Sequence, residues 1–350
     1  GHTIRNLCVD YETAAQGERV YLGLFGCVEG TKEQHAVIRA LQVEGSVQAA
    51  SGFSVYTGAI GGIVGDAKYA ELSGLVSRVA VSADENVGKA VGLGGLGGVL
   101  VNCTLTNCGN EGDVSGVKNL GGVCYELYSG TMTGCYNTGS VTGTGTYVGG
   151  LMGYAKKAQL TNVYNTGNVS TAKSQIGGLI GVMENASLTN AYNTGKVTVT
   201  ETGGMHVGAV AGWAETLSNV YYLEGSADKA FGKGEATAEA KSAEALKALA
   251  PKLGDGFAAD SAVLNGGYPI LRWQAAEETL LGDVNGDGAV DNLDAALTYA
   301  HFNGKKLLSD AALAAADVNR DGKVNNLDAA LIYALFNGKI KNFSDAAKAD

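Results

Sequence analysis

The sequence has no long uninterrupted apolar segment. Glycine breaks the apolar stretches every few positions, so no run reaches the roughly 18 residues that a membrane-spanning helix needs. This excludes a transmembrane helix. Proline is also scarce, at 2 residues of 350, whereas Gly occurs 53 times without the three-residue period of collagen. Together with many Val, Thr, Asn and Tyr residues, this composition predicts a β-rich chain with frequent tight turns.

Basic residues are too few to line a nucleic acid. Lys and Arg number 25 against 35 Asp and Glu, which gives a net charge of −10, and no basic stripe follows the chain. A protein that binds a nucleic-acid backbone needs such a stripe, so nucleic acid is excluded as a partner. Hard cations are the partners that this charge favours.

Cysteine is limited to six residues, all in the first half of the chain. None forms a CxxC pair or lies near a group of histidines, which disfavours a zinc site. An even number would permit disulfides in a secreted protein, but we favour the alternative that these side chains pack as small apolar residues in a repetitive core. The six are Cys8, Cys27, Cys103, Cys108, Cys124 and Cys135.

A signal peptide is not found in the sequence. The first residues, GHTIRNLCVD, resemble the middle of a strand rather than a charged and apolar leader. We therefore expect the native start of the protein, with its signal peptide, to lie outside this chain.

One unit of sequence recurs through the first two thirds of the chain. The clear copies are GGVCYELYSGTMTGCYNTGSV from Gly121, GGLMGYAKKAQLTNVYNTGNV from Gly149 and GGLIGVMENASLTNAYNTGKV from Gly177. A weaker copy starts at Gly94 and a partial one at Gly208. A fixed period of roughly 20 to 50 residues is typical of solenoid architectures.

The same residue types recur at equivalent positions of each unit. We expect each unit to hold two or three short strands joined by Asn-Thr-Gly turns, in which Asn and Gly supply a positive φ. Units stacked at about 4.8 Å bury a continuous core that one unit could not bury alone, so the sequence predicts a parallel β-solenoid, or β-helix. The columns are Asn110, Asn137, Asn165 and Asn193; Gly112, Gly139, Gly167 and Gly195; Val114, Val141, Val169 and Val197; and Cys108, Cys135, Val163, Ala191 and Val220.

These repeats resemble the bacterial GLUG-motif family, whose units pair a GG(L/I)xG segment with an NxYNTG turn. The resemblance covers roughly residues 1–273 and is closest from Gly94 to Gly225. It implies a secreted or cell-surface bacterial protein, of the kind found among adhesins and accessory regions of proteases. The family has no established general chemistry, so the resemblance implies architecture rather than an activity.

The composition changes after Tyr222 and becomes rich in Ala, Glu and Lys. Ser242 is a candidate N-cap of a short amphipathic helix, and Pro251 and Gly254 are candidate stop signals. We expect Asp260 to Trp273 to end in a strand that closes the apolar end of the stack. The predicted organisation is a mainly β solenoid over 1–223, a helix and strand cap over 224–273, a linker over 274–280, a small α-helical module over 281–343 and a tail over 344–350.

Two segments of the C-terminal module carry the spacing of a calcium loop. Ca²⁺ takes about six to eight oxygens, which a twelve-residue loop delivers from positions 1, 3, 5, 7, 9 and 12, with Gly at position 6 for the sharp turn. We therefore expect two calcium ions. The predicted ligands are Asp283, Asn285, Asp287, the carbonyl of Ala289, Asp291 (directly or through a water) and Asp294 in the first loop, and Asp317, Asn319, Asp321, the carbonyl of Lys323, Asn325 and Asp328 in the second.

A helix is predicted after each loop, with nearly the same sequence in both copies. NLDAALTYAHFNG starts at Asn292 and NLDAALIYALFNG at Asn326, an offset of 34 residues, and no clear helix enters either loop. The duplicated loop and exit helix resemble the type I dockerin family, an EF-hand-like module that binds cohesin domains of a scaffold protein in cellulosome-like assemblies. The resemblance implies calcium-dependent docking outside the cell, through a secreted or surface-associated scaffold.

In dockerins the cohesin contact comes from loop positions 10 and 11 and from the outward face of the exit helix. The near identity of the two helices implies that either could face the cohesin after a half-turn of the module, a dual binding mode. By resemblance, the contact residues are Asn292, Leu293, Ala300 and His301 in the first copy, and Asn326, Leu327, Ala334 and Leu335 in the second.

No catalytic residue is predicted. A glycosidase needs two carboxylates about 5 to 10 Å apart, whereas Glu126, Glu184 and Glu215 do not share a column of the repeat. The four histidines show no metal or triad spacing, and no serine elbow, HExxH helix or phosphate loop occurs. The leading interpretation is a non-catalytic adhesive or ligand-binding solenoid. The alternatives are a glycoside hydrolase or lyase subunit carried by the dockerin, and catalysis on upstream sequence.

One column of aromatic residues bears on the ligand of the solenoid. Tyr136, Tyr164 and Tyr192 could stack on sugar rings, but we favour inward packing of these side chains. The same two interpretations apply to Trp213 and Trp273. A glycan or a host surface ligand is the partner that we expect for the solenoid.

Overall fold

The computed structural model of the protein describes residues 2–13, 19–51, 57–89, 91–201, 205–275 and 280–343. The chain divides into two compact units, Gly1–Gln274 and Ala275–Asp350. Each unit has its own apolar core. Within the described ranges, no helix is long and apolar enough to cross a membrane.

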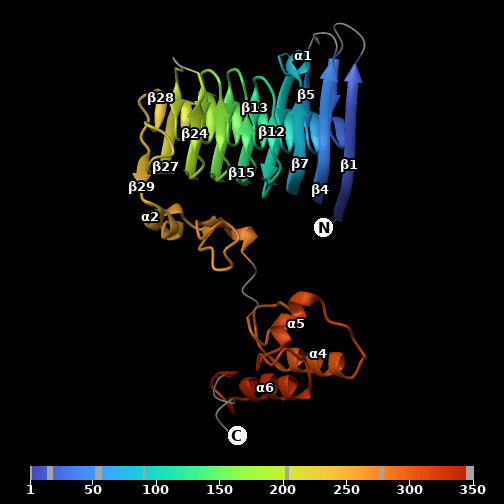
Figure 1. Cartoon of the computed structure of the whole chain (residues 1–350). Helices are drawn as coiled ribbons and strands as arrows, with labels where there is room; N and C mark the ends of the chain where they lie inside the picture. The colour runs from blue at the N-terminus through green and yellow to red at the C-terminus, as the bar shows by residue number, and fades with distance from the viewer. Residues whose placement is uncertain are drawn as a thin grey trace. The chain divides into compact units, whose positions relative to one another are not determined.

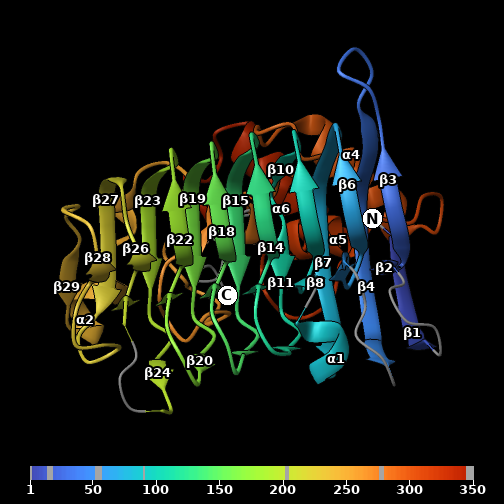
Figure 2. The same ribbon diagram turned by 90° about the horizontal axis from the view of Figure 1, so that it is seen from above.

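The first unit is built from three parallel sheets, A, B and C, that wind around one core (Figure 1, Figure 2). Each turn of the chain, or rung, adds strands to all three sheets, and this confirms the predicted parallel β-solenoid. Sheet A contains β1 (His2–Thr13), β4 (Ala36–Ser51), β7 (Ala70–Ala83), β10 (Thr104–Thr106), β11 (Gly109–Asn110), β12 (Val114–Ser115), β15 (Thr131–Asn137), β16 (Val141–Thr142), β19 (Gln159–Asn165), β20 (Val169–Thr171), β23 (Ser187–Asn193), β24 (Val197–Val199), β27 (Thr216–Leu223) and β29 (Glu239–Lys241). Sheet B contains β2 (Arg19–Leu22), β5 (Thr57–Gly61), β8 (Val91–Gly94), β13 (Leu120–Gly121), β17 (Val148–Gly149), β21 (Ile176–Gly177) and β25 (Val207–Gly208). Sheet C contains β3 (Phe25–Glu29), β6 (Val64–Lys68), β9 (Gly97–Val101), β14 (Cys124–Tyr128), β18 (Met152–Lys156), β22 (Ile180–Glu184), β26 (Ala211–Trp213) and β28 (Phe231–Lys233).

The asparagine column forms a buried ladder that joins four rungs. Asn110, Asn137, Asn165 and Asn193 are paired in register, and none of them is exposed. Each amide nitrogen donates to the amide oxygen of the next asparagine, at 2.8, 2.8 and 2.9 Å. Buried amides need such partners, so a one-residue slip of register would leave them unpaired.

Positive φ angles occur at columns other than the one predicted. In one rung they fall at Lys157 (52°), Asn162 (54°) and Gln175 (61°), and the equivalent residues of neighbouring rungs repeat them. The Gly167 column has no positive φ. A Cβ at Gly167 would lie 1.9 Å from the carbonyl oxygen of Gly139, so glycine is required there by the close approach of the preceding rung. The predicted conformational reason for this glycine is therefore wrong.

The cysteines are all free thiols, and four of them lie in the core. Cys135 pairs in register with Val163 on the next rung and contacts the buried thiol of Cys108 on the preceding one, so no charged group adjoins it along the column. Burial raises the pKa of Cys103 to about 11, and it also raises the pKa of Cys135. These thiols pack as small apolar residues, whereas Cys8 and Cys27 are exposed.

Residues 242–274 run back along the flank of the stack, over the outer face of sheet A. Ser242 caps α2 (Ala243–Lys247), as predicted, but Pro251 lies in the first turn of a second helix, α3 (Ala250–Leu253), which ends at Gly254. Short strands β30 (Phe257–Ala258) and β31 (Ile270–Leu271) form an antiparallel pair, and the 3₁₀ helix η1 (Arg272–Gln274) follows.

The tyrosine column explains why this segment lies on the flank instead of closing the end of the stack. Tyr136, Tyr164 and Tyr192 project from the outer face of sheet A, not into the solenoid, and form a separate apolar cluster with α2, α3 and β30. Consecutive rings stack at 5.4 and 5.1 Å between centroids. This apolar strip is left uncovered by the sheet itself, so burying it drives the segment onto the flank. The expectations of inward packing and of a strand that closes the stack are therefore wrong.

The second unit contains α4 (Asn292–Phe302), α5 (Asp310–Ala316) and α6 (Asn326–Phe336). Its small core gathers Val284, Ala316 and Ile332 with neighbouring apolar residues. Helix α5 leads directly into the second loop, which corrects the prediction that no helix enters a loop. Ser309 caps α5, and the alanines that follow have the highest helix propensity, so the signal was present in the sequence.

Candidate functional site

The first loop of the second unit is folded around its own carboxylates. Asp294 is fully buried, and one of its oxygens accepts the N–H groups of Val284 (2.8 Å) and Asn285 (3.0 Å). Its other oxygen accepts the N–H of Asp291 at 2.8 Å, so the last position of the loop is tied both to positions 2 and 3 and to position 9. Gly288 has a φ of +87° at the predicted sharp turn.

The second loop repeats this geometry. Asp328 is fully buried and accepts the N–H groups of Val318 (3.1 Å) and Asn325 (2.9 Å). Gly322 has a φ of +82°. The loops differ in charge, because the first holds four aspartates and no basic residue, whereas the second holds three aspartates together with Arg320 and Lys323.

The donor set of both loops suits a hard cation. The predicted ligand atoms are all carboxylate, amide or carbonyl oxygens, which calcium prefers. Asp283 Oδ1 accepts the N–H groups of Gly286 (2.8 Å) and Asp287 (3.2 Å), whereas its Oδ2 accepts only the N–H of Gly288 (2.8 Å) among the described residues and keeps a further lone pair for a metal. In the described residues, no three His, Cys, Asp or Glu side chains converge as a metal site, because the loop aspartates turn to backbone N–H groups. The ligand assignment therefore stays a prediction.

Each loop passes into its exit helix through a capping box. The side chains of Asp291 and Asn325 cap the N-termini of α4 and α6. In return, the buried carboxylates of Asp294 and Asp328 accept the backbone N–H of these two cap residues. Position 11 of each loop is then held on the surface: Leu293 is 52% exposed and Leu327 is 51% exposed. Such matched exposure shows that the two copies present the same apolar side chain.

The other predicted contact residues are distributed unevenly. Asn292 and Asn326 are exposed, whereas Ala300, His301, Ala334 and Leu335 are half-buried. The ring nitrogen Nδ1 of His301 accepts the N–H of Leu308 at 3.3 Å. Sequence reasoning missed one exposed aromatic pair in each helix, although the exact duplication of these residues was a signal. The pairs are Tyr299 and Phe302 in α4, and Tyr333 and Phe336 in α6.

Comparison with family models bears out both sequence resemblances. The model of the dockerin type I domain matches residues 281–337, and the GLUG motif matches residues 173–200. Residues 281–337 are a type I dockerin domain. Dockerins of this type bind calcium and have cohesin domains as partners, and dockerin-containing proteins are typically extracellular.

Comparison with solved structures and curated proteins adds little on activity. One solved structure, titled "Crystal structure of a putative immunoglobulin A1 protease from Bacteroides ovatus", is 19% identical to this chain with a TM-score of 0.49. The alignment covers 74% of this chain and 88% of that chain. No curated protein matches.

Outside the dockerin, the acidic side chains of sheet C do not form a catalytic pair. Glu126 and Glu184 stand in different columns, since Glu126 pairs with Tyr154 and Glu184 with Lys156. Burial raises the pKa of Glu126, while hydrogen bonds from Lys156 and Tyr154 lower the pKa of Glu184. Glu184 is held by both donors, with Lys156 Nζ at 2.9 Å, so it serves as an ion-pair partner.

The histidines also remain apart from one another. His2 is exposed, His35 lies 3.8 Å from Glu71, and His206 stands beside the ring of Trp213. The remaining one, His301, belongs to the dockerin. Each therefore has a separate environment, and none is paired with a described serine or cysteine.

Proposed function

We propose that this protein is a secreted, non-catalytic component of a multiprotein assembly, attached by its dockerin to a cohesin of a scaffold protein. The observation that carries the proposal is the matched pair of loop and helix copies, in which Leu293 and Leu327 are equally exposed. Exposed apolar residues at the same position of both copies would let the dockerin contact one cohesin surface in either of two orientations. The solenoid supplies a rigid surface for binding a ligand.

Two calcium ions are part of the proposal. The six predicted positions of each loop would hold one ion, with the buried aspartates Asp294 and Asp328 closing the loops. Calcium supplies the charge that lets several carboxylates lie close together, and loop closure then orders the exit helices. A module of some 60 residues has a small core, so its folding should depend on the metal.

Titration calorimetry of the full chain against a panel of cohesins, with calcium and then with chelator, tests the proposal. We expect tight binding that is lost with chelator. Leu293→Asp and Leu327→Asp should each leave binding nearly intact, because the other copy remains, whereas the double variant should bind at least about a hundredfold more weakly. Leu307→Asp is the matched control, since Leu307 is an 84% exposed leucine of the same module outside the predicted contact.

Two outcomes would contradict the proposal. If no cohesin binds the calcium-loaded protein, the assembly role fails. If Leu293→Asp alone abolishes binding, the dual mode fails while the docking role stands. The alternative of a polysaccharide-degrading subunit predicts release of reducing sugar from plant or mucin glycans, which the non-catalytic proposal does not.

A further inference from the structure

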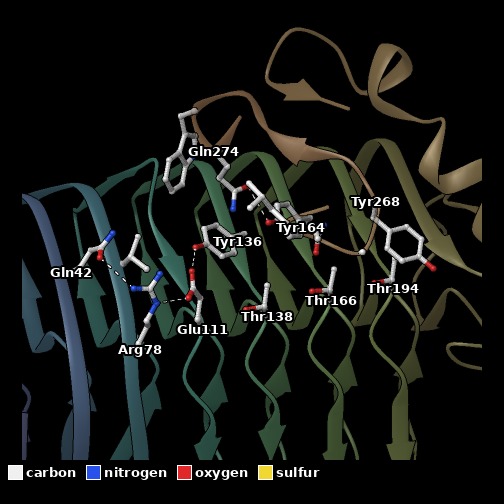
Figure 3. Close-up of a pocket in the computed structure, with 15 residues that line it drawn as sticks. Gln42, Arg78, Glu111, Tyr136, Thr138, Tyr164, Thr166, Thr194, Tyr268 and Gln274 are labelled. Carbon is white, nitrogen blue, oxygen red and sulfur yellow. Dashed lines mark hydrogen bonds and ion pairs between the residues drawn. The ribbon is translucent and has the colours of Figure 1, made fainter. Parts of the chain in front are cut away.

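A groove of about 760 Å³ lies on the outer face of sheet A, beneath residues 264–274 (Figure 3). We call it the sheet A groove. Its floor comes from successive rungs and its roof from the segment that returns along the flank, so it lies wholly within the first unit. Small-ligand sites typically measure roughly 300 to 1,000 Å³. The sheet A groove is thus large enough for a ligand made of a few linked units.

The floor of the groove carries a row of threonine hydroxyls. Thr138, Thr166 and Thr194 follow the asparagine ladder on three consecutive rungs and stand in a row in Figure 3. Their N–H groups pair with carbonyls of the preceding rung, but no described residue forms a hydrogen bond with their hydroxyls. Neighbouring rungs are about 4.8 Å apart. The floor therefore offers identical polar groups at a fixed repeat to a ligand with a similar repeat.

The roof adds aromatic rings and an oriented amide. Trp273 is anchored by its ring N–H, which donates to the carbonyl of Gly134 at 2.8 Å, and Tyr268 lines the groove farther along. The side-chain oxygen of Gln274 accepts from Tyr164 Oη (3.0 Å) and from a backbone N–H (2.9 Å). The amide nitrogen of Gln274 is consequently aimed at the groove, and no described residue accepts a hydrogen bond from it.

The groove carries no net charge. Arg78 and Glu111 are the charged residues among those that line it, and Arg78 Nε donates to Glu111 Oε2 at 2.6 Å. The second oxygen of Glu111 accepts from Tyr136 Oη, also at 2.6 Å. Both charges are therefore satisfied within the protein. A charged ligand would gain nothing from them, and a single hydrogen-bonded carboxylate does not form the acid pair of a glycosidase.

We propose that the sheet A groove binds a neutral oligosaccharide. Sugar rings stack on Tyr268 and Trp273, and their hydroxyls bond to the threonine row and to the amide nitrogen of Gln274. A peptide that bound by strand addition would need an open sheet edge, whereas β19 on the floor is paired on both sides. The inference rests on the proposed role of the solenoid as a binding module, and it is independent of the dockerin.

The fluorescence of Trp273 in the full-length protein provides the test. The chain has two tryptophans, so Trp213→Phe leaves Trp273 as the single reporter inside the groove. Cello-, xylo- and manno-oligosaccharides are titrated as probes, with an oligogalacturonate as the charged comparison. We expect a saturable change with at least one neutral probe, unaffected by chelator.

Three variants in the same background locate the site. Thr166→Val should weaken binding about fivefold and Tyr268→Ala about tenfold, from the loss of one hydrogen bond and of one stacking surface. Thr161→Val should leave affinity unchanged, because Thr161 lies on β19, the strand that Thr166 directly follows, but outside the groove.

Specific results would overturn the inference. These are no saturable change with any neutral probe, unchanged affinity in both groove variants, tighter binding of the oligogalacturonate, or binding of peptides in place of sugars. Cohesin binding by the same preparation is measured separately. Loss of sugar binding with retained cohesin binding overturns the groove alone, whereas sugar binding without cohesin binding overturns the docking proposal and leaves the groove.

Discussion

The asparagine ladder provides the most direct test of how the rungs are held together. In the centre of the ladder, the amide nitrogen of Asn165 donates to Asn193 Oδ1 (2.9 Å) and to the carbonyl of Gly167 (2.7 Å). Its oxygen accepts from Asn137 Nδ2 at 2.8 Å. Asn165→Ala removes these three hydrogen bonds and leaves one N–H of Asn137 buried without an acceptor.

The expected loss of unfolding free energy is about 4 kcal/mol. Each of the three hydrogen bonds contributes about 1 kcal/mol net, and the orphaned N–H costs about 1 kcal/mol more. Domains are stable by roughly 5–15 kcal/mol, so the variant should still fold. The magnitude follows from burial, because an exposed asparagine would exchange its partners for water at little cost.

Urea unfolding followed by the β-sheet circular dichroism signal measures the loss, and a double-mutant cycle isolates the contact. The pair of Asn137→Ala and Asn165→Ala shares one hydrogen bond, so their effects should fall short of additivity by about 1–2 kcal/mol. Asn110→Ala and Asn193→Ala, three rungs and about 14 Å apart, form the matched control and should be additive. Equal coupling in both cycles, or a loss below about 1 kcal/mol for Asn165→Ala, would refute the ladder as a stabilising element.

Other parts of the chain lead to further expected results. A thiol reagent at about pH 8 should label only Cys8 and Cys27 in the native protein, because the other four cysteines are buried, and all six in denaturant. Labelling of more than two cysteines in native buffer would contradict the core placement of those four. Burial raises the pKa of Glu126, so the folded state holds this proton more tightly than the unfolded chain, and stability falls as the pH rises to the raised pKa. Glu126→Gln should therefore stabilise the solenoid at about pH 7 and have little effect at about pH 4. The gain at about pH 7 should be less than about 1 kcal/mol, because the side chain is partly exposed. Urea unfolding at both pH values measures it, and an equal gain in stability at the two would disprove desolvation as the cause. Asn325→Asp adds a fourth carboxylate to the second loop and should tighten its calcium binding about tenfold, as titration calorimetry would show, whereas an unchanged affinity would remove Asn325 from the ligand set.

The stacking of the solenoid could be predicted because its signal is local and periodic. A column such as Asn137 and Asn165 exists only if equivalent residues of successive units lie side by side, so the repeat itself encodes the register. The dockerin was predictable for a similar reason, since all the positions of a calcium loop fall within twelve residues of sequence.

The predictions that failed concern side-chain direction and close approach. The sequence does not distinguish whether the side chains of the Tyr164 column point into the solenoid or away from it, because an apolar strip on either face of the sheet only needs other residues to cover it. Gly167 is required by the carbonyl of Gly139 in the preceding rung, a contact that turn propensities do not describe. The entering helix α5 was missed although its serine cap and alanines were present, because its short length gives little periodicity.

The sequence by itself determined the repeating unit, its register and the twelve-residue pattern of the two loops, because these depend on residues close together or at a fixed period. Only the tertiary structure decided that residues 242–274 fold back over the tyrosine column and create the sheet A groove. The contacts that hold this segment in place join Tyr164 to Gln274 and Gly134 to Trp273, across 110 and 139 residues of chain. Contacts at such separations follow no period, and the burial of an exposed apolar strip determines them only once the solenoid has formed.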